Sequence, residues 1–403
     1  MPYDVAALRD QFPSLSSGVA HFDGPGGTQA PRVVAEAIAA TLLGPLSNRG
    51  TVSGSERNAD AAVAAFRAAF ADLLGFPANG IVYGRSATQL TYDMSRAMSK
   101  TWIRGDEVVV SRLDHDGNVR PWVQAAEAVG ATIRWIDIDP ATGEVDLDSV
   151  AAAITPATRL VAITGASNLI GTIPPHRYIA DLAHAVGALL YIDAVHYAAH
   201  EFVDPAALGA DIIVCSPYKF LGPHCGVLGA DPALLERFWP DKLLPSTTVV
   251  PERYELGTLP YETLAGATAA VDFLAAIAPG DATSRREQLR SSFAAIDEHE
   301  LALRQRLEAG LAALPGLVVH SRAARRTPTL LVSLPGRKTR DAYEFLAERD
   351  VLAPAGQFYA YEPYRRLGID DDGGLRLGLA PYSTTEDVDR AVSALAELLA
   401  DRD

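Results

Sequence analysis

Between about residue 58 and residue 230, the hydrophobic positions of the chain alternate between two periods. Residues 58–76 carry apolar side chains at helical spacing, which predicts a helix capped at its C-terminal end by Gly75. Short apolar runs bounded by turn residues follow at 80–84, 106–111, 131–138, 159–164, 188–193, 211–216 and 226–230. Most are separated by stretches of helical length, and parallel strands need such crossovers. The pattern predicts an α/β fold with a mostly parallel, seven-stranded sheet between helices.

The pattern changes near residue 280. Residues 278–316 predict one long, charged, amphipathic helix that ends at Pro315-Gly316. After it we expect two strands and two helices, at 327–334, 338–349, 375–380 and 385–401, the second and fourth being the helices. We therefore expect a large domain over residues 21–280 and a smaller α+β domain formed by residues 1–20 and 281–403.

Composition narrows the class of protein. The chain has 403 residues, 48% of them hydrophobic, so it can bury a large core. Its formal charge of −15 argues against a nucleic-acid partner. Cys215 and Cys225 form neither a disulfide framework nor a metal-ligand grouping, which indicates a reducing compartment and no metal site. Without a long apolar run or a leader-like N-terminus, we expect a soluble, cytoplasmic protein with no membrane partner.

Candidate chemistry lies where the predicted strands end, because ligands of open α/β sheets bind outside the carboxyl ends of the strands. Asp193 ends the apolar run at 188–193, and Lys219 lies three residues beyond the run at 211–216; both side chains are costly to bury. They allow two interpretations, a structural ion pair or a shared cofactor. Pyridoxal phosphate fits the second, because it needs a lysine amine for its Schiff base and an acid beside its pyridine nitrogen.

A phosphate-binding segment accompanies this pair. The chain leaves a predicted strand through Gly84 and enters a helix, so the amides of Ala87 and Thr88 are expected at a helix N-terminus. An ordinary N-cap is the alternative explanation of that segment. Ser216, three residues before Lys219, adds a hydroxyl.

Four motifs make the chain resemble the class V aminotransferases, and within them the cysteine desulfurase branch. They are LDHDGNVRPW, ITGASNLIGTI, LLYIDAVH and CSPYKFLGP, in the order and at the approximate spacings of that family. The similarity extends from about residue 21 to residue 384. It implies the aspartate aminotransferase-like architecture of fold-type-I enzymes, with pyridoxal 5'-phosphate as the cofactor.

The resemblance implies a role for each matching residue at the cofactor ring. Lys219 matches the lysine that binds the cofactor covalently, and Asp193 matches the partner of the pyridine nitrogen. His115 matches a catalytic histidine that stacks on the ring. His196 stands where the family usually has a glutamine that hydrogen-bonds the phenolic oxygen, and a histidine can donate there too. Asn168 matches an asparagine near that oxygen and the substrate carboxylate.

Other matches concern the phosphate. Thr88 and Ser216 match phosphate ligands beside the Ala87 amide. Tyr218 stands where the desulfurases usually have a histidine that helps to hold the phosphate. Thr258 is similar to a threonine that reaches the phosphate of the neighbouring subunit, so the resemblance implies a homodimer.

The resemblance implies that the substrate is a small α-amino acid, and two arginines complete the residues expected to bind it. Arg376 matches the arginine that binds the substrate carboxylate, a task that suits its planar, bidentate fork. An arginine in an apolar run would otherwise need a buried acid, and the sequence nearby offers no obvious one. Arg49 is expected at the rim of the active site, and Asn168 is expected to share the carboxylate with Arg376.

Three departures from the desulfurases stand out. Their nucleophilic cysteine lies on a loop that corresponds to residues 353–368, where this chain has Tyr359 and no cysteine. Tyrosine cannot accept sulfur as a persulfide. In addition, Tyr218 precedes the lysine, and Asp116 follows His115 where one desulfurase branch has a second histidine.

We interpret the chain as a pyridoxal-phosphate-dependent aminotransferase, or as a cysteine desulfurase-like C–S or β-lyase, that acts on a small α-amino acid. Racemisation shares the same first steps and stays open. A non-catalytic or moonlighting relative that keeps the fold is one alternative. A nucleotide-binding oxidoreductase is another, but it needs a glycine fingerprint that residues 84–89 lack.

Overall fold

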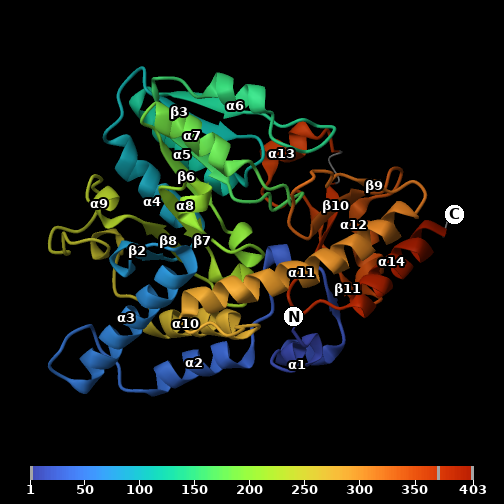
Figure 1. Cartoon of the computed structure of the whole chain (residues 1–403), viewed down its shortest axis with the longest axis horizontal. Coiled ribbons are helices and arrows are strands. Elements are labelled where there is room, and N and C mark those ends of the chain that lie inside the picture. The colour runs from blue at the N-terminus through green and yellow to red at the C-terminus, as the bar shows by residue number, and fades with distance from the viewer. Residues whose placement is uncertain (1–2, 370–372, 401–403) are drawn as a thin grey trace.

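The computed structural model describes residues 3–369 and 373–400 of the chain. Its largest sheet has seven strands in the order β2-β8-β7-β6-β5-β3-β4 (Figure 1). The strands are β2 (Ile81–Gly84), β3 (Glu107–Ser111), β4 (Thr132–Ile136), β5 (Thr158–Thr164), β6 (Leu189–Asp193), β7 (Ile212–Cys215) and β8 (Gly226–Ala230). The pairs among β4, β3, β5, β6 and β7 are parallel, and β8 is antiparallel to both of its neighbours. The seven strands coincide with the seven apolar runs, so the predicted mostly parallel sheet is confirmed.

Along each central strand, successive side chains alternate between two hydrophobic cores, one on each face of the sheet. In β6, Leu190 and Ile192 belong to one core and Tyr191 belongs to the other. Helices cover both faces, and they are α3 (Gly54–Leu74), α4 (Ala87–Ser99), α5 (Arg120–Val129), α6 (Leu147–Ala153), α7 (His176–Ala185), α8 (Pro205–Leu208) and α10 (Tyr261–Ala276). Residues of α3, α7 and α10 close the first core, and residues of α4 and α5 close the second. Because both faces are buried, the strands have continuous apolar sequences.

Helix ends agree with the local sequence. The predicted C-cap, Gly75, ends α3 with a φ of +75°, a conformation that favours glycine. The helix begins earlier than the predicted residue 58, because Ser53 and Glu56 form a capping box ahead of it. The helix that was expected to follow Gly84 begins at Ala87.

The C-terminal part begins with α11 (Arg285–Ala312), which is shorter at both ends than the predicted helix over residues 278–316. It continues in a four-stranded sheet of order β12-β13-β10-β9, in which every pairing is antiparallel. These strands are β9 (Val318–Val319), β10 (Thr329–Ser333), β12 (Ala355–Gly356) and β13 (Gly374–Gly378). The two predicted helices are α12 (Thr339–Ala347) and α14 (Thr385–Ala400), and the predicted end of the second, Asp401, lies outside the described residues.

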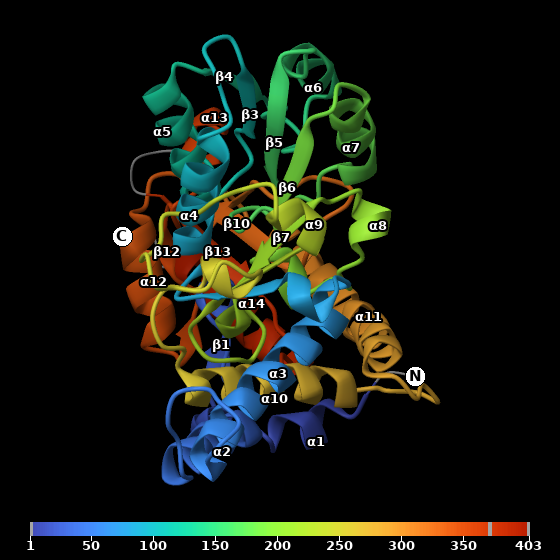
Figure 2. The ribbon, with the colours of Figure 1, turned by 90° about the vertical axis from the view of Figure 1, so that its left-hand side faces the viewer.

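The N-terminal segment packs on the C-terminal part of the chain. Strand β1 (Ala20–His21) pairs in parallel with β11 (Val351–Leu352), and Arg9 of α1 (Val5–Arg9) forms an ion pair with Asp387. The helix α2 (Arg32–Leu43) packs on α10, at the bottom of Figure 2. Two short helices, α9 (Pro232–Leu235) and α13 (Tyr361–Arg366), complete the described elements other than 3-10 turns. No helix among the described residues is both long and apolar enough to cross a membrane.

Candidate active site

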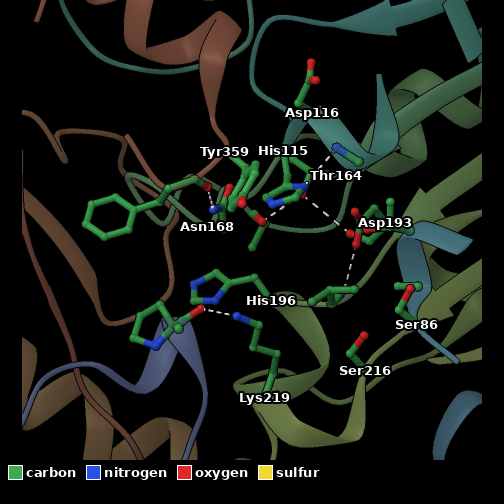
Figure 3. A pocket seen from close by; sticks show the side chains of 18 of the residues that line it. Ser86, His115, Asp116, Thr164, Asn168, Asp193, His196, Ser216, Lys219 and Tyr359 are labelled. Atoms are coloured by element: carbon green, nitrogen blue, oxygen red, sulfur yellow. Dashed lines mark hydrogen bonds between the residues drawn. The ribbon is translucent and has the colours of Figure 1, made fainter. Parts of the chain in front are cut away.

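A cavity of about 590 Å³ opens where the carboxyl ends of the parallel strands meet the C-terminal part of the chain. Side chains from both parts face it (Figure 3). It brings together most of the residues that the sequence predicted for the site, namely Ala87, Thr88, His115, Asn168, Asp193, His196, Ser216, Tyr218, Lys219 and Arg376. The cavity is the strongest candidate for the active site because it joins segments that are far apart in the sequence.

Lys219 and Asp193 reach the cavity from adjacent strands. Asp193 is the last residue of β6, and Lys219 ends the 3-10 turn that follows β7. The ammonium of Lys219 donates a short hydrogen bond to the carbonyl oxygen of Pro25, and the Asp193 carboxylate accepts one from the Val195 amide at 2.9 Å. Among the described residues, no ion pair joins Asp193 to Lys219, so the purely structural pair is not formed.

Burial changes the acidity of both groups. It lowers the pKa of Lys219 to about 7, an effect that the nearby Arg376 cation increases and the Asp193 charge opposes. Burial also raises the pKa of Asp193 to about 6, although its hydrogen bond and the Lys219 cation act in the other direction. A lysine amine that is neutral near physiological pH can act as a nucleophile or a base.

His115 is held in one tautomer. It caps the turn at residues 116–118, and its Nδ1 accepts a hydrogen bond from the Gly117 amide at 2.9 Å, so the ring proton lies on Nε2. Burial and then the cations Lys219 and Arg376 lower the pKa of His115 to about 4. His115 is therefore neutral near physiological pH.

His196 is buried at the floor of the cavity. Its Nε2 lies 2.9 Å from Oγ1 of Thr327 and 3.1 Å from Oγ1 of Thr329. Burial, followed by the cations around it, lowers its pKa well below the usual range for histidine. Nε2 of His196 is thus occupied by two threonines of the C-terminal part, and Nδ1 is the ring nitrogen that remains for another partner.

Arg376 and Asn168 form one unit. Nη1 of Arg376 donates to the Asn168 carbonyl oxygen at 2.9 Å, and the guanidinium lies 3.8 Å from the centre of the Phe358 ring. The Asn168 side chain donates to the Phe358 carbonyl oxygen at 2.9 Å. Two buried polar atoms stay without a hydrogen-bond partner, Nε of Arg376 and Oδ1 of Asn168. Unused buried polar atoms of this kind call for a ligand.

The N-terminus of α4 lies at the opposite side of the site. Ser86 caps it by accepting the Gln89 amide, and the amides of Ala87 and Thr88 lie in the first turn, where a helix lacks internal acceptors. A Cβ atom on Gly226 would lie 2.3 Å from the carbonyl carbon of Ser86 and 2.6 Å from the Ala87 nitrogen. Only glycine allows β8 to pass this closely beneath the helix N-terminus.

Two predicted residues lie elsewhere. Arg49 forms ion pairs with Asp60 at 2.8 Å and with Glu252 at 3.3 Å, and Thr258 is exposed on a turn. Neither lines the cavity of its own subunit.

The sequence profile of the class-V aminotransferases matches residues 20–391. The chain belongs to the class-V aminotransferase family. It is a pyridoxal-phosphate-dependent enzyme that acts on an amino acid, of the transferase or lyase kind, as the sequence predicted.

Its relatives include a protein named as aminotransferase-like and proteins named as cysteine desulfurases. The aminotransferase-like protein FGM3 of Gibberella zeae is 30% identical over 419 residues, which cover 98% of this chain and 99% of that protein. The crystal structure of the cysteine desulfurase CsdA from Escherichia coli superposes with a TM-score of 0.86 and 27% identity, covering 99% of each chain. C-DES, solved as a variant with glycine linked to its PLP cofactor, has a TM-score of 0.78 and 20% identity over 96% of this chain and 99% of that one, which shows the fold alone.

The donor set of this class-V aminotransferase fits pyridoxal phosphate. A lysine amine with a pKa of about 7, a buried carboxylate and an uncharged histidine ring face one cavity, and helix amides and Ser216 lie at its other side. Ser216 is buried directly after β7. When bound, this cofactor withdraws electrons from the α-carbon of an amino acid that is joined to it.

The loop over residues 353–368 contributes Phe358 and Tyr359 to the lining of the cavity. Phe358 and Tyr359 have φ angles of +54° and +57°, which non-glycine residues seldom adopt. The Tyr359 carbonyl accepts the Asp116 amide at 2.7 Å, and its ring lies 5.6 Å from that of His115. Cys215 and Cys225 are buried, and neither described cysteine lines the cavity.

Sequence reasoning missed several residues that line the cavity, among them Pro25, Phe358 and Arg120. Pro25 contributes only a carbonyl oxygen, for which the sequence carries no side-chain signal. Phe358 supports Arg376 and Asn168 from a segment that was considered only for its missing cysteine. Arg120 lines the cavity while paired with Asp116 and Glu362.

Proposed function

We propose that Lys219 binds pyridoxal phosphate covalently and, when a substrate amine replaces it, removes the proton from the substrate α-carbon. The observation that carries this proposal is that Lys219 and Asp193 face one cavity from adjacent strands without pairing with each other. The lowered pKa of Lys219, about 7, suits a base that works near neutral pH. Asp193 would hold the ring nitrogen protonated, and His115 would stack on the ring.

We infer that the phosphate lies at the N-terminus of α4, held by the amides of Ala87 and Thr88 and by the hydroxyl of Ser216. Tyr218 would lie beside the phosphate, because the Tyr218 side chain lines the cavity. Its ring is held by stacking on His224, with 4.6 Å between the ring centres. At the other end, Arg376 would bind the carboxylate of the amino acid through its unused Nε–H donor. Oδ1 of Asn168 can only accept, so Asn168 would bind the carboxylate through its Nδ2–H donor in place of the Phe358 carbonyl. These contacts fix the substrate so that its α-carbon faces Lys219.

The test is a spectral screen of the purified protein against single amino acids. A substrate should change the visible band of the bound cofactor, and the same amino acid should leave the band of an Arg376→Gln variant unchanged at that concentration. A protein whose band responds to no amino acid would contradict the proposal.

We favour a reaction that forms no persulfide on the protein, whether it is transamination or elimination. A persulfide requires a thiolate. Burial raises the pKa of Cys225 to about 12 and raises the pKa of Cys215 well above its usual range, so both thiols stay protonated. Transamination, or elimination to free sulfide, needs no thiol from the protein.

Incubation with L-cysteine is therefore expected to leave the protein without a sulfur adduct, as read by mass spectrometry of the intact chain. The Cys225→Ala variant should keep its activity, because the Cys225 side chain lies outside the cavity. An adduct on Cys225 that disappears in this variant together with activity would identify a desulfurase with a relocated acceptor.

We further propose a homodimer in which Thr258 reaches the phosphate of the partner's site. Large apolar side chains are exposed on two segments, 42–52 and 243–256, and they include Leu43, Val52 and Leu244. Both segments lie on the side of the molecule that faces the viewer in Figure 2, and the Arg49–Glu252 ion pair joins them. Exposed apolar surface of this kind is typical of protein interfaces. In the dimer, Arg49 would stand at the rim of a shared site.

Complementation tests this arrangement. Thr258→Ala is expected to weaken cofactor binding about tenfold, because a charge-assisted hydrogen bond is lost. In a mixed dimer with Lys219→Ala chains, one site regains both an intact Lys219 and the partner's threonine. Affinity at half of the sites should then return to the wild-type value. A mixture without recovery, or an active monomer in sedimentation, would contradict the shared site.

The division into a large domain over residues 21–280 and a small domain of residues 1–20 and 281–403 remains part of this proposal. The separate seven-stranded and four-stranded sheets support it. The two unpaired cysteines support a reducing compartment, and we propose the cytoplasm.

A further inference from the structure

A buried acid and a buried histidine lie behind the candidate site, and the mechanism above does not use them. Nδ1 of His200 lies 2.8 Å from Oε2 of Glu300, and both side chains are almost fully buried. His200 follows the 3-10 turn after His196, and Glu300 belongs to α11. Oε1 of Glu300 has no hydrogen-bond partner. Burying such a pair costs free energy, so a pair with an unused oxygen needs an explanation beyond stability.

A second, small cavity connects this pair to Lys219. Its volume is about 10 Å³, which is close to the space that a single water molecule requires. Lys219, His200, His196 and Thr28 line it together with apolar residues. Lys219 and His196 also line the large cavity, so they form the wall between the two. Because Nδ1 of His200 is bound to Glu300, its Nε2 is the nitrogen that remains for a contact with this cavity.

The surrounding charges decide which of these groups can hold a proton. His196 is not a candidate, because burial, its neighbour His200 and the cations Arg376 and Lys219 hold its pKa well below the usual range. The charged and titratable groups near Lys219 include Arg376, Asp193, His115, His196 and Tyr218, and those near His200 and Glu300 include His196, Glu201, Tyr3 and Tyr382. Glu300 is the acid in direct contact with His200, so a proton on His200 gains a charged partner.

We propose that His200 and Glu300 form a proton store for Lys219. The inference rests on the proposed function, in which Lys219 takes the α-proton of the substrate. The Lys219 ammonium passes a proton through one water in the small cavity to Nε2 of His200. Lys219 becomes a neutral amine, and the positive charge moves to His200, where the Glu300 carboxylate stabilises it. The reverse transfer returns the proton, and no electrons are exchanged. His200 and Glu300 act through Lys219 and touch neither substrate nor cofactor.

The first test needs no substrate. Ring nitrogen signals of His200 in ¹⁵N NMR report its protonation, and we compare cofactor-free wild-type protein with cofactor-free Lys219→Met. Removing the neighbouring ammonium should move the protonation of His200 to higher pH, by about half a pH unit or more for coupled groups. His184, which forms a similar 2.9 Å pair with Asp211 at the surface, is the internal control and should not move. An unchanged His200 signal would overturn the proposal.

The second test measures a ratio, so that a merely structural defect does not affect it. L-alanine deuterated at its α-carbon, or the amino acid that the spectral screen identifies, is converted in ordinary water. Wild-type protein should lose most of the label, because Lys219 exchanges its proton with the store. In His200→Asn and Glu300→Gln, the ratio of deuterium retained to deuterium lost should rise about tenfold. In Glu300→Asp, this ratio should fall part of the way back to the wild-type value. His184→Asn should behave like wild type.

The outcomes separate the two proposals. If no amino acid reacts, the proposed function fails, and the NMR comparison still decides whether Lys219 and His200 are coupled. If amino acids react but both variants give the wild-type ratio, the proton store is wrong and the proposed function stands. If His200→Asn or Glu300→Gln does not fold, His200→Gln takes its place. The intensity of the visible cofactor band then shows whether the active site of that variant is intact.

Discussion

Replacing Lys219 with alanine is expected to abolish both the visible band of the bound cofactor and turnover, with a loss in rate of roughly 10⁴-fold or more. The physical reason is that Lys219 supplies two functions at once, the covalent link to the cofactor and the base that takes the α-proton. Lys219 lines the described cavity, and because its pKa is lowered to about 7, its side chain is a neutral amine in a large fraction of molecules near pH 7. We expect the fold to survive, because the ammonium makes one hydrogen bond to a backbone carbonyl and no ion pair among the described residues.

The measurement combines an absorption spectrum with single-turnover kinetics. Lys100→Ala is the matched control, because Lys100 is a surface lysine paired with Asp241 and distant from the cavity lining. It should keep the spectrum and the rate. A Lys219→Ala protein that still forms a borohydride-reducible link to the cofactor, without added amine, would show that another residue binds it.

Asp193→Asn is expected to bind the cofactor and lose about 3 kcal/mol of transition-state stabilisation, a rate loss of 10²- to 10³-fold. Asparagine has nearly the same shape and can still accept the Val195 amide, so the local structure should persist. It lacks the negative charge that keeps the ring nitrogen protonated. The loss should therefore appear in removal of the α-proton rather than in substrate affinity.

Exchange of the α-hydrogen with deuterated water measures this step directly. Asp106→Asn serves as the control, because Asp106 is also buried but pairs with Arg159 near the start of β3, away from the cavity. That variant should lose stability and keep its exchange rate per folded molecule. Near-normal exchange in Asp193→Asn would mean that the ring nitrogen has a different partner.

The central sheet could be predicted because its strands are buried on both faces. A strand such as β7 then consists of apolar residues alone, and the polar residue that follows it marks the edge where ligands bind. Asp193, Ser216 and Lys219 were found in this way. Arg376 could be predicted as a site residue for a related reason, since an arginine in a buried strand needs a partner that the nearby sequence does not provide.

Contacts between distant segments could not be predicted from local patterns. The carbonyl of Pro25 meets Lys219 across 194 positions, and a backbone oxygen leaves no trace in the sequence. The His200–Glu300 pair joins residues 100 positions apart, and Glu300 reads as one more charge on a long amphipathic helix. The early start of α3 was a different kind of error, because the capping box at Ser53 was present in the sequence and was not used.

Borohydride reduction followed by peptide mapping, with and without a reactive amino acid, tests the role of Lys219 most directly. Without amino acid, the reduced cofactor should be found on the peptide that contains Lys219. With amino acid added before reduction, the label should leave Lys219 and appear on the amino acid itself. A label on any other residue, or one that stays on Lys219 at saturating amino acid, would contradict the assignment of Lys219 as the residue that holds the cofactor and yields it to the substrate.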